Sequence, residues 1–122
     1  MQDEDGAAFG MPGGETCGSA SARPMDLEHL ARQTMGDREL EREVLALFVQ
    51  QAISVRDGIA AADAQQRRSL AHGLKGAARG VGAFTVAEWA AGVESRPQDE
   101  RHLKRLGPLI EEVRDFIAAI SR

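Results

Sequence analysis

The hydrophobic residues that follow Met25 recur at helical spacing. In the middle of the chain they fall at steps of three, four and seven residues, which places them on one side of a helix: Leu40, Val44, Leu47, Phe48, Val55 and Ile59. Near the C-terminus a second series alternates steps of three and four, as in a helix packed along others: Leu103, Leu106, Ile110, Val113, Ile117 and Ile120. No segment alternates like a strand, so the pattern predicts an all-α, antiparallel helical bundle.

The first helix boundaries are marked by capping residues. Asp26 can cap a short helix that runs to Met35, where Gly36 would end it in a left-handed turn. Asp37 can cap the long helix that follows, which we expect to end within residues 60–64.

Glycine and proline mark the later boundaries. They predict three further helices, over about residues 65–80, 84–94 and 99–120. Pro108 lies inside the last of these, where it removes one backbone hydrogen bond and should kink the helix near Gly107.

The first 24 residues differ from the rest in composition. Five of the thirteen glycines and two of the four prolines fall there, and the apolar residues show no period. Such a segment buries too little surface to offset its ordering entropy. We therefore expect residues 1–24 to form a disordered Gly/Ser-rich tail and residues 25–122 to form one helical domain.

Composition and charge exclude several classes of protein. The net charge of −4, from 15 basic and 19 acidic side chains, argues against a dedicated nucleic-acid binder. No apolar run approaches the roughly 20 residues of a membrane helix, and the N-terminus lacks the pattern of a signal peptide. Cys17 is the single cysteine, so no internal disulfide can form, and we expect a cytoplasmic protein. His29 and His102 are expected on helix surfaces, and the histidines show no zinc spacing.

Candidate chemistry is concentrated in the helix predicted over residues 65–80. At about 100° per residue, its apolar residues cluster within roughly 40° of the point opposite His72: Leu70, Leu74, Ala77 and Val81. The residues within about 60° of His72 are three cations and a glycine: Arg68, Lys75, Gly76 and Arg79. His72 therefore points outward among positive charges that can offset an incoming phosphoryl group.

Three glycines in this helix are unusual, because each costs roughly 1 kcal/mol relative to alanine. They are Gly73, Gly76 and Gly80. Gly76 lies one turn after His72, where a side chain would crowd the imidazole. The missing side chain clears space for another protein to come close to His72. The neutral imidazole of histidine is a good nucleophile at cell pH.

The run Ala71-His72-Gly73-Leu74-Lys75-Gly76-Ala77-Ala78-Arg79-Gly80-Val81-Gly82-Ala83 resembles the signature of histidine-containing phosphotransfer (HPt) domains of the bacterial phosphorelay type. The similarity continues through Val86, Ala90 and Val93-Glu94. Two positions depart from the family pattern: many relatives have Ser or Thr where Ala77 stands and cysteine where Ala90 stands. Neither position is the nucleophile.

The resemblance implies a four-helix antiparallel bundle with a short additional N-terminal helix, and a carrier without kinase activity of its own. His72 would accept a phosphoryl group from a receiver-domain aspartate and pass it to another receiver. Lys75 would lie beside the phosphate, Gly76 would permit docking, and Glu94 could hold the ring through its other nitrogen. Arg68, Ser69 and Arg79 would line the docking surface.

The implied partners are response-regulator receiver domains and a hybrid histidine kinase, with no nucleic acid or membrane and with the domain as a monomer. No cofactor is expected in this chain, because the Mg²⁺ of the reaction would belong to the receiver.

Two other interpretations remain open. A helical adaptor could bind receivers without accepting phosphate, although it would not need an outward histidine beside a cleared position. The protein could also be an enzyme, either a kinase or a phosphatase that uses His72 as a base. A kinase would need a nucleotide-binding domain, and no glycine-rich phosphate loop is present.

Overall fold

The structure, a computed structural model, describes residues 23–121, and this part of the chain is helical with no strand. Its helices are α3 (Leu27–Gln33), α4 (Arg38–Ile59), α5 (Ala64–Val81), α6 (Phe84–Ser95) and α7 (Glu100–Ile120). The prediction of a disordered tail over residues 1–24 lies almost entirely outside the described residues. None of the described helices combines the length and apolarity that crossing a membrane requires.

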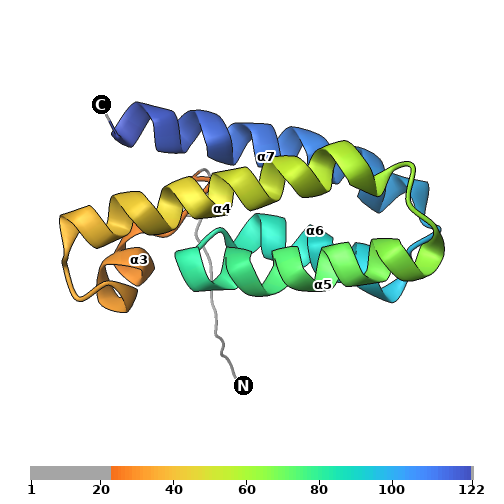
Figure 1. Cartoon of the computed structure of the whole chain (residues 1–122), viewed down its shortest axis with the longest axis horizontal. Coiled ribbons are helices and arrows are strands. Elements are labelled where there is room, and N and C mark those ends of the chain that lie inside the picture. Colours follow the sequence, from red (N-terminus) through yellow and green to blue (C-terminus); the bar gives the residue numbers. More distant parts are fainter. Residues whose placement is uncertain (1–22, 122) are drawn as a thin grey trace, which may run out of the picture.

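The four long helices form an antiparallel bundle, and the short α3 packs at one end of it (Figure 1). Consecutive helices run in opposite directions, with α4 and α7 in the upper row of the view and α5 and α6 in the lower row. The predicted fold class, a four-helix bundle with a short additional N-terminal helix, is confirmed.

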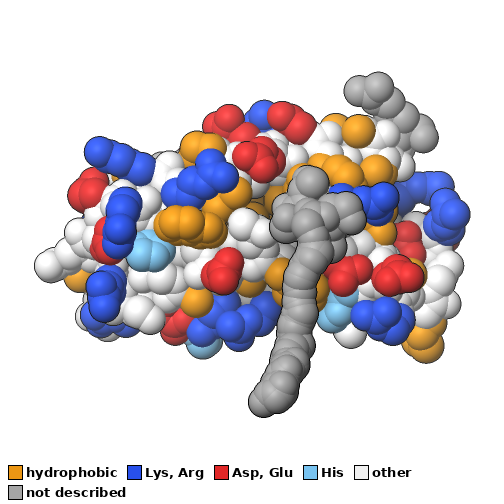
Figure 2. Space-filling view, turned by 180° about the vertical axis from the view of Figure 1, so that it is seen from behind, with side chains coloured by type: hydrophobic (Ala, Val, Ile, Leu, Met, Phe, Trp, Pro, Cys, Tyr) orange, Lys and Arg blue, Asp and Glu red, His pale blue; other side chains and the backbone are white. Residues whose placement is uncertain are grey.

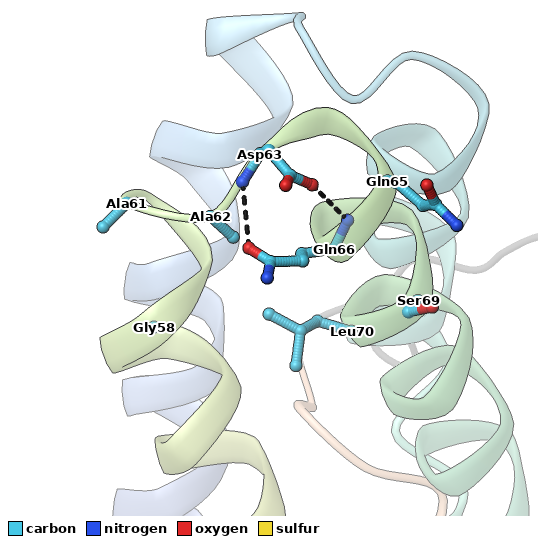
Figure 3. A pocket seen from close by; sticks show the side chains of 8 residues that line it. All are labelled: Gly58, Ala61, Ala62, Asp63, Gln65, Gln66, Ser69 and Leu70. Carbon is cyan, nitrogen blue, oxygen red and sulfur yellow. Dashed lines mark hydrogen bonds between the residues drawn. The ribbon is translucent and has the colours of Figure 1, made fainter.

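Aspartates cap the N-termini of four of the helices. The side chains of Asp26, Asp37, Asp63 and Asp99 each accept a hydrogen bond from a backbone N–H of the first turn, which satisfies a donor that lacks a helical partner. At α5 the cap is reciprocal, because the Gln66 side chain also accepts from the Asp63 backbone N–H at 3.2 Å (Figure 3). These caps explain why each of these helices begins where it does.

The buried side of α4 differs from the predicted one. Its core residues are Leu45, Phe48, Ala52, Val55 and Ile59. Leu40 and Leu47 were expected on this side, but 38% and 66% of their surfaces are exposed. On the helical wheel Leu47 lies about 120° from the middle of this buried stripe, so it falls outside the stripe.

The other two predicted apolar sides also need correction. In α7 Leu109 is buried, whereas Ile120 is 43% exposed because it ends the helix beyond the packed core. In α5 the buried residues are Ala71, Leu74, Ala78 and Val81. Leu70 and Ala77 are only partly buried and pack at the edge of the core.

Small side chains let α5 and α6 approach closely. Ala71 and Ala78 on α5 and Ala90 on α6 are fully buried, with no surface exposed. Alanine fills little space between two helix axes, so the backbones come together and side chains at the edges of the two helices meet. This close packing brings the end of α6 beside the middle of α5.

Both ends of α5 are hydrogen-bonded to other parts of the chain. At its start Arg67 donates to the carbonyl oxygens of Ile59 at 3.0 Å, Ala60 at 2.6 Å and Pro97 at 3.0 Å, which ties the end of α4 to the loop before α7. At its end Gly82 has φ of +87°, and its carbonyl accepts from the Asp26 N–H at 2.9 Å. A Cβ there would lie 2.6 Å from the Asp26 oxygen, so this contact requires glycine. The helix is therefore held at a fixed position along the bundle.

Pro108 does not interrupt α7. The helix is continuous from Glu100 to Ile120, with the proline inside it. The sequence predicts a kink near Gly107, and that kink stays a prediction. Gly107 faces α4, where a Cβ would lie 3.8 Å from the Arg56 side chain, an ordinary contact distance.

Candidate functional site

His72 lies in the middle of α5 with its side chain 70% exposed. Ala71, just before His72, and Leu74, two residues after it, are both buried. The helix therefore turns the imidazole away from the core. Arg68 and Arg79 are exposed on the same helix. The His72 imidazole is therefore exposed to solvent, on a helix that is hydrogen-bonded to other parts of the chain at both ends.

Glu94, near the end of α6, binds both His72 and Lys75. Its Oε2 lies 2.8 Å from His72 Nδ1, and its Oε1 accepts from Lys75 Nζ at 2.5 Å. An ionised carboxylate can only accept hydrogen bonds, so the contact to the neutral ring requires the proton on Nδ1. The other ring nitrogen, Nε2, then carries the free lone pair, which is the nucleophilic form of imidazole.

The two partners also affect the charge of Glu94. The hydrogen bond from Lys75 and then that from His72 lower the pKa of the Glu94 carboxyl below its ordinary value of 4.5, against a smaller opposing effect of burial. Both bonds favour the ionised form, because they are made to its oxygens. Glu94 is therefore a carboxylate at neutral pH, as the proton position on His72 requires.

The two sides of α5 next to His72 differ in charge. On the wheel, Arg68, Lys75 and Arg79 lie toward α6, while Gly73, Gly76 and Gly80 lie toward α4. A Cβ at Gly76 or Gly80 would meet no atom within 4 Å, and one at Gly73 would meet only the Gln51 side chain, at 3.6 Å. No packing contact therefore requires glycine at these positions, and their effect is to leave the surface beside His72 open.

The surface beyond these glycines is uncharged. Residues 44–55 of α4 contain no Asp, Glu, Lys or Arg, although Leu47, Gln51 and Ser54 are exposed. The opposite face of the molecule has acidic and basic side chains intermixed across it (Figure 2). The α4 part of the surface next to His72 therefore differs in charge from the face drawn in Figure 2.

The comparison with protein-family models gives one match, to the Hpt domain, over residues 38–122. This range is most of the chain and contains the four long helices and the exposed histidine. The chain belongs to the Hpt domain family. No curated protein and no solved structure matches the chain significantly.

Hpt domains are histidine phosphocarrier modules of phosphorelays and interact with response-regulator receiver domains. The recognition made from the motif around His72 is therefore confirmed at the level of the family. The matched range begins at Arg38, so α3 lies outside it.

Most residues predicted for the site lie together on α5 of this Hpt domain. The structure places Arg68, Ser69, Gly76 and Arg79 on exposed positions of that helix, around His72. Glu94 comes from α6 and reaches the ring nitrogen that the resemblance implied.

Sequence reasoning missed the ion pair between Lys75 and Glu94. Lys75 was expected to reach outward to a phosphate, but its side chain is only 20% exposed and is held by Glu94. Opposite charges on neighbouring antiparallel helices are a weak signal for such a pair, because the distance depends on how closely α5 and α6 pack.

His29 and His102, which were expected on helix surfaces, are partly buried. The His29 ring packs edge-on against Phe84, with centroids 5.1 Å apart. The His102 ring lies 4.9 Å from the Trp89 ring and covers Gly92, where a Cβ would overlap it. Both rings act in packing, which leaves His72 as the exposed histidine of residues 23–121.

Proposed function

We propose that this Hpt domain accepts a phosphoryl group on His72 Nε2 from the aspartate of a receiver domain and passes it to the aspartate of another receiver. The observation that supports this most strongly is the contact between His72 Nδ1 and Glu94 Oε2, 2.8 Å. It leaves the nucleophilic nitrogen of a 70% exposed ring without a proton.

The chemistry of the step needs no base. The Nε2 lone pair attacks phosphorus, and the bond between phosphorus and the aspartyl oxygen breaks, so that the receiver carboxylate leaves with the electron pair. The Nδ1 proton stays in place, and the imidazole becomes a cation that carries the phosphoryl group. Glu94 positions the ring, Lys75 and the arginines Arg68 and Arg79 offset the incoming negative charge, and the Mg²⁺ of the reaction belongs to the receiver.

The open α4–α5 surface is the proposed docking site for the receiver. At one end of it a hollow lies beside the α4–α5 turn, lined by small residues such as Gly58, Ala61 and Ala62 and by Ser69 (Figure 3). Ser69 precedes His72 by one turn, so a partner side chain in the hollow would lie next to the reacting atoms. Gly76, one turn after His72 along the helix, would let the receiver approach His72 within bonding distance.

The remaining features of the proposal concern the cellular setting. The donor would be the receiver domain of a hybrid histidine kinase, and the acceptor that of a response regulator, in the cytoplasm. The domain buries its own core between four helices, so it needs no second copy and is proposed to act as a monomer. Gel filtration at several concentrations tests this last point, since a dimer would elute at twice the mass.

The test of the main proposal is transfer from phosphorylated receivers. The full chain is mixed with a panel of radiolabelled receiver domains, and label on the chain is measured together with binding. Wild-type protein and the control His102→Gln, which removes a histidine used in packing, should take up label, and His72→Gln should not. Binding of a receiver without labelling of the wild type would instead support the helical adaptor.

A further inference from the structure

At the acceptor site the Glu94 carboxylate contacts two side chains, those of Lys75 and His72. Glu94 Oε1 is paired with Lys75 Nζ at 2.5 Å, and Glu94 Oε2 lies 2.8 Å from His72 Nδ1. The side chains of Lys75 and Glu94 are 20% and 26% exposed, so the pair is partly shielded from water. In the unphosphorylated protein the Lys75 charge is thus already neutralised.

Phosphorylation of His72 changes the charges around this carboxylate. The ring that attacks phosphorus must be neutral, and Lys75 then supplies the full positive charge in contact with Glu94. After attack by Nε2 the ring keeps its Nδ1 proton and is a cation, so Glu94 gains a second counterion. The phosphoryl group brings about two negative charges to the other side of the same ring.

We propose that Glu94 exchanges counterions when His72 is phosphorylated: it keeps the cationic ring through Nδ1–H and releases Lys75, whose ammonium turns to the phosphoryl oxygens. This inference rests on the proposed function and adds a switch to it. Lys75 is three residues from His72, and such residues have Cβ atoms about 5–6 Å apart on a helix, so a change of side-chain rotamer is enough for the move.

Glu94 and Lys75 each have a partner of opposite charge in both states under this exchange. The unphosphorylated site contains Glu94 and Lys75 as a pair, with a neutral ring. The phosphorylated site contains Glu94 with the imidazolium and Lys75 with the phosphoryl group. When the phosphoryl group leaves, the ring becomes neutral again, and Lys75 returns to Glu94, so the exchange is reversible in step with the transfer.

The composition of the chain makes the exchange measurable. Lys75 and Lys104 are the only lysines, and Lys104 is exposed on α7. In protein labelled with ¹⁵N at lysine Nζ, NMR should therefore give one signal from the site and one internal reference. Potassium phosphoramidate serves as a phosphoryl donor that needs no partner protein, and ³¹P NMR reports the phosphohistidine.

The expected result has two parts. In the wild type, phosphorylation should shift the Lys75 Nζ signal and leave that of Lys104 in place, while the Nδ1–H signal of His72 persists. In Glu94→Gln, where the amide oxygen can still accept from Nδ1–H but has no charge, Lys75 should already be free. Its signal should then resemble that of Lys104 before any phosphorylation.

Three outcomes decide the matter. A phosphohistidine signal at His72 with an unchanged Lys75 signal overturns the exchange and leaves the carrier function intact. An unchanged Lys75 signal in unphosphorylated Glu94→Gln also overturns it, because Glu94 would then not hold the lysine. If neither phosphoramidate nor a phosphorylated receiver gives phosphohistidine in the wild type, the proposed function fails, and the exchange fails with it.

Discussion

Substitution of Gly76 separates helix stability from access to His72. A Cβ at this position meets no atom within 4 Å, so alanine adds no clash in the folded protein. Alanine in place of an interior helical glycine contributes about 0.8–1.0 kcal/mol to stability. For a domain of this size 1 kcal/mol corresponds to a rise in Tm of roughly 4–8 °C. We expect Gly76→Ala to melt several degrees higher than the wild type.

A longer side chain at the same position should slow the transfer strongly. Gly76 lies four residues after His72, about 6 Å along the helix at a rise of 1.5 Å per residue. A glutamine there extends into the space from which a receiver must bring phosphorus within bonding distance of Nε2. We expect Gly76→Gln to lower the transfer rate about 10–100-fold, which corresponds to roughly 1.4–2.8 kcal/mol in the barrier.

Gly80→Gln is the matched control. Gly80 is also free of contacts within 4 Å and lies on the same side of α5. It is about 12 Å from His72 along the helix, so the same side chain there should slow the transfer much less. The assay is transfer from one phosphorylated receiver to each variant, with thermal unfolding in parallel. Gly76→Gln that melts above the wild type and still transfers at the wild-type rate would refute the reasoning.

Three further variants test the site and its support. His72→Gln should fold with a stability within about 0.5 kcal/mol of the wild type, because the side chain is exposed, and the wild-type label that it lacks should be acid-labile and base-stable. Arg67→Met loses hydrogen bonds to three carbonyl oxygens and should be destabilised by about 2–4 kcal/mol in urea unfolding, whereas Arg68→Met should be near neutral. Lys75→Met removes the main cause of the lowered pKa of Glu94, so that pKa should rise in an NMR titration of the carboxyl carbon. The stability that ionised Glu94 contributes is present above pH 4.5 and is lost as the pH falls through the lowered pKa of Glu94 in the folded protein. Lys75→Met should therefore weaken the pH dependence of the unfolding free energy below pH 4.5. An unchanged pH dependence would contradict this.

The sequence is sufficient to predict the number and order of the helices in residues 23–121, because the signals that set them are local. Asp26 and Asp37 cap helices where expected, and Gly36 has the predicted left-handed conformation. The exposed position of His72 also follows from the wheel, since the helix period relates it directly to the buried Leu74.

Contacts between helices were harder to predict, because they depend on where the helices approach. Leu47 is more apolar than Ala52, yet Ala52 is buried and Leu47 is exposed, because Ala52 lies on the side of α4 that contains Phe48 and Val55. The Lys75–Glu94 pair is missed for the same reason. It requires the close approach of α5 and α6 over Ala71 and Ala78, which hydrophobicity alone does not indicate.

The fastening of α5 at both ends has a consequence for what its middle can tolerate. Three glycines in one helix cost roughly 3 kcal/mol relative to alanine, and an isolated helix with this sequence would be weak. Arg67 at one end and the Gly82–Asp26 contact at the other stabilise the helix through positions far from the histidine. The exposed side chains on the surface around His72, such as those of Arg68 and of His72 itself, then contribute little to the stability of the fold. Sequence change on that surface can then alter which partner is recognised without unfolding the domain, whereas change at Arg67 or Gly82 should be poorly tolerated.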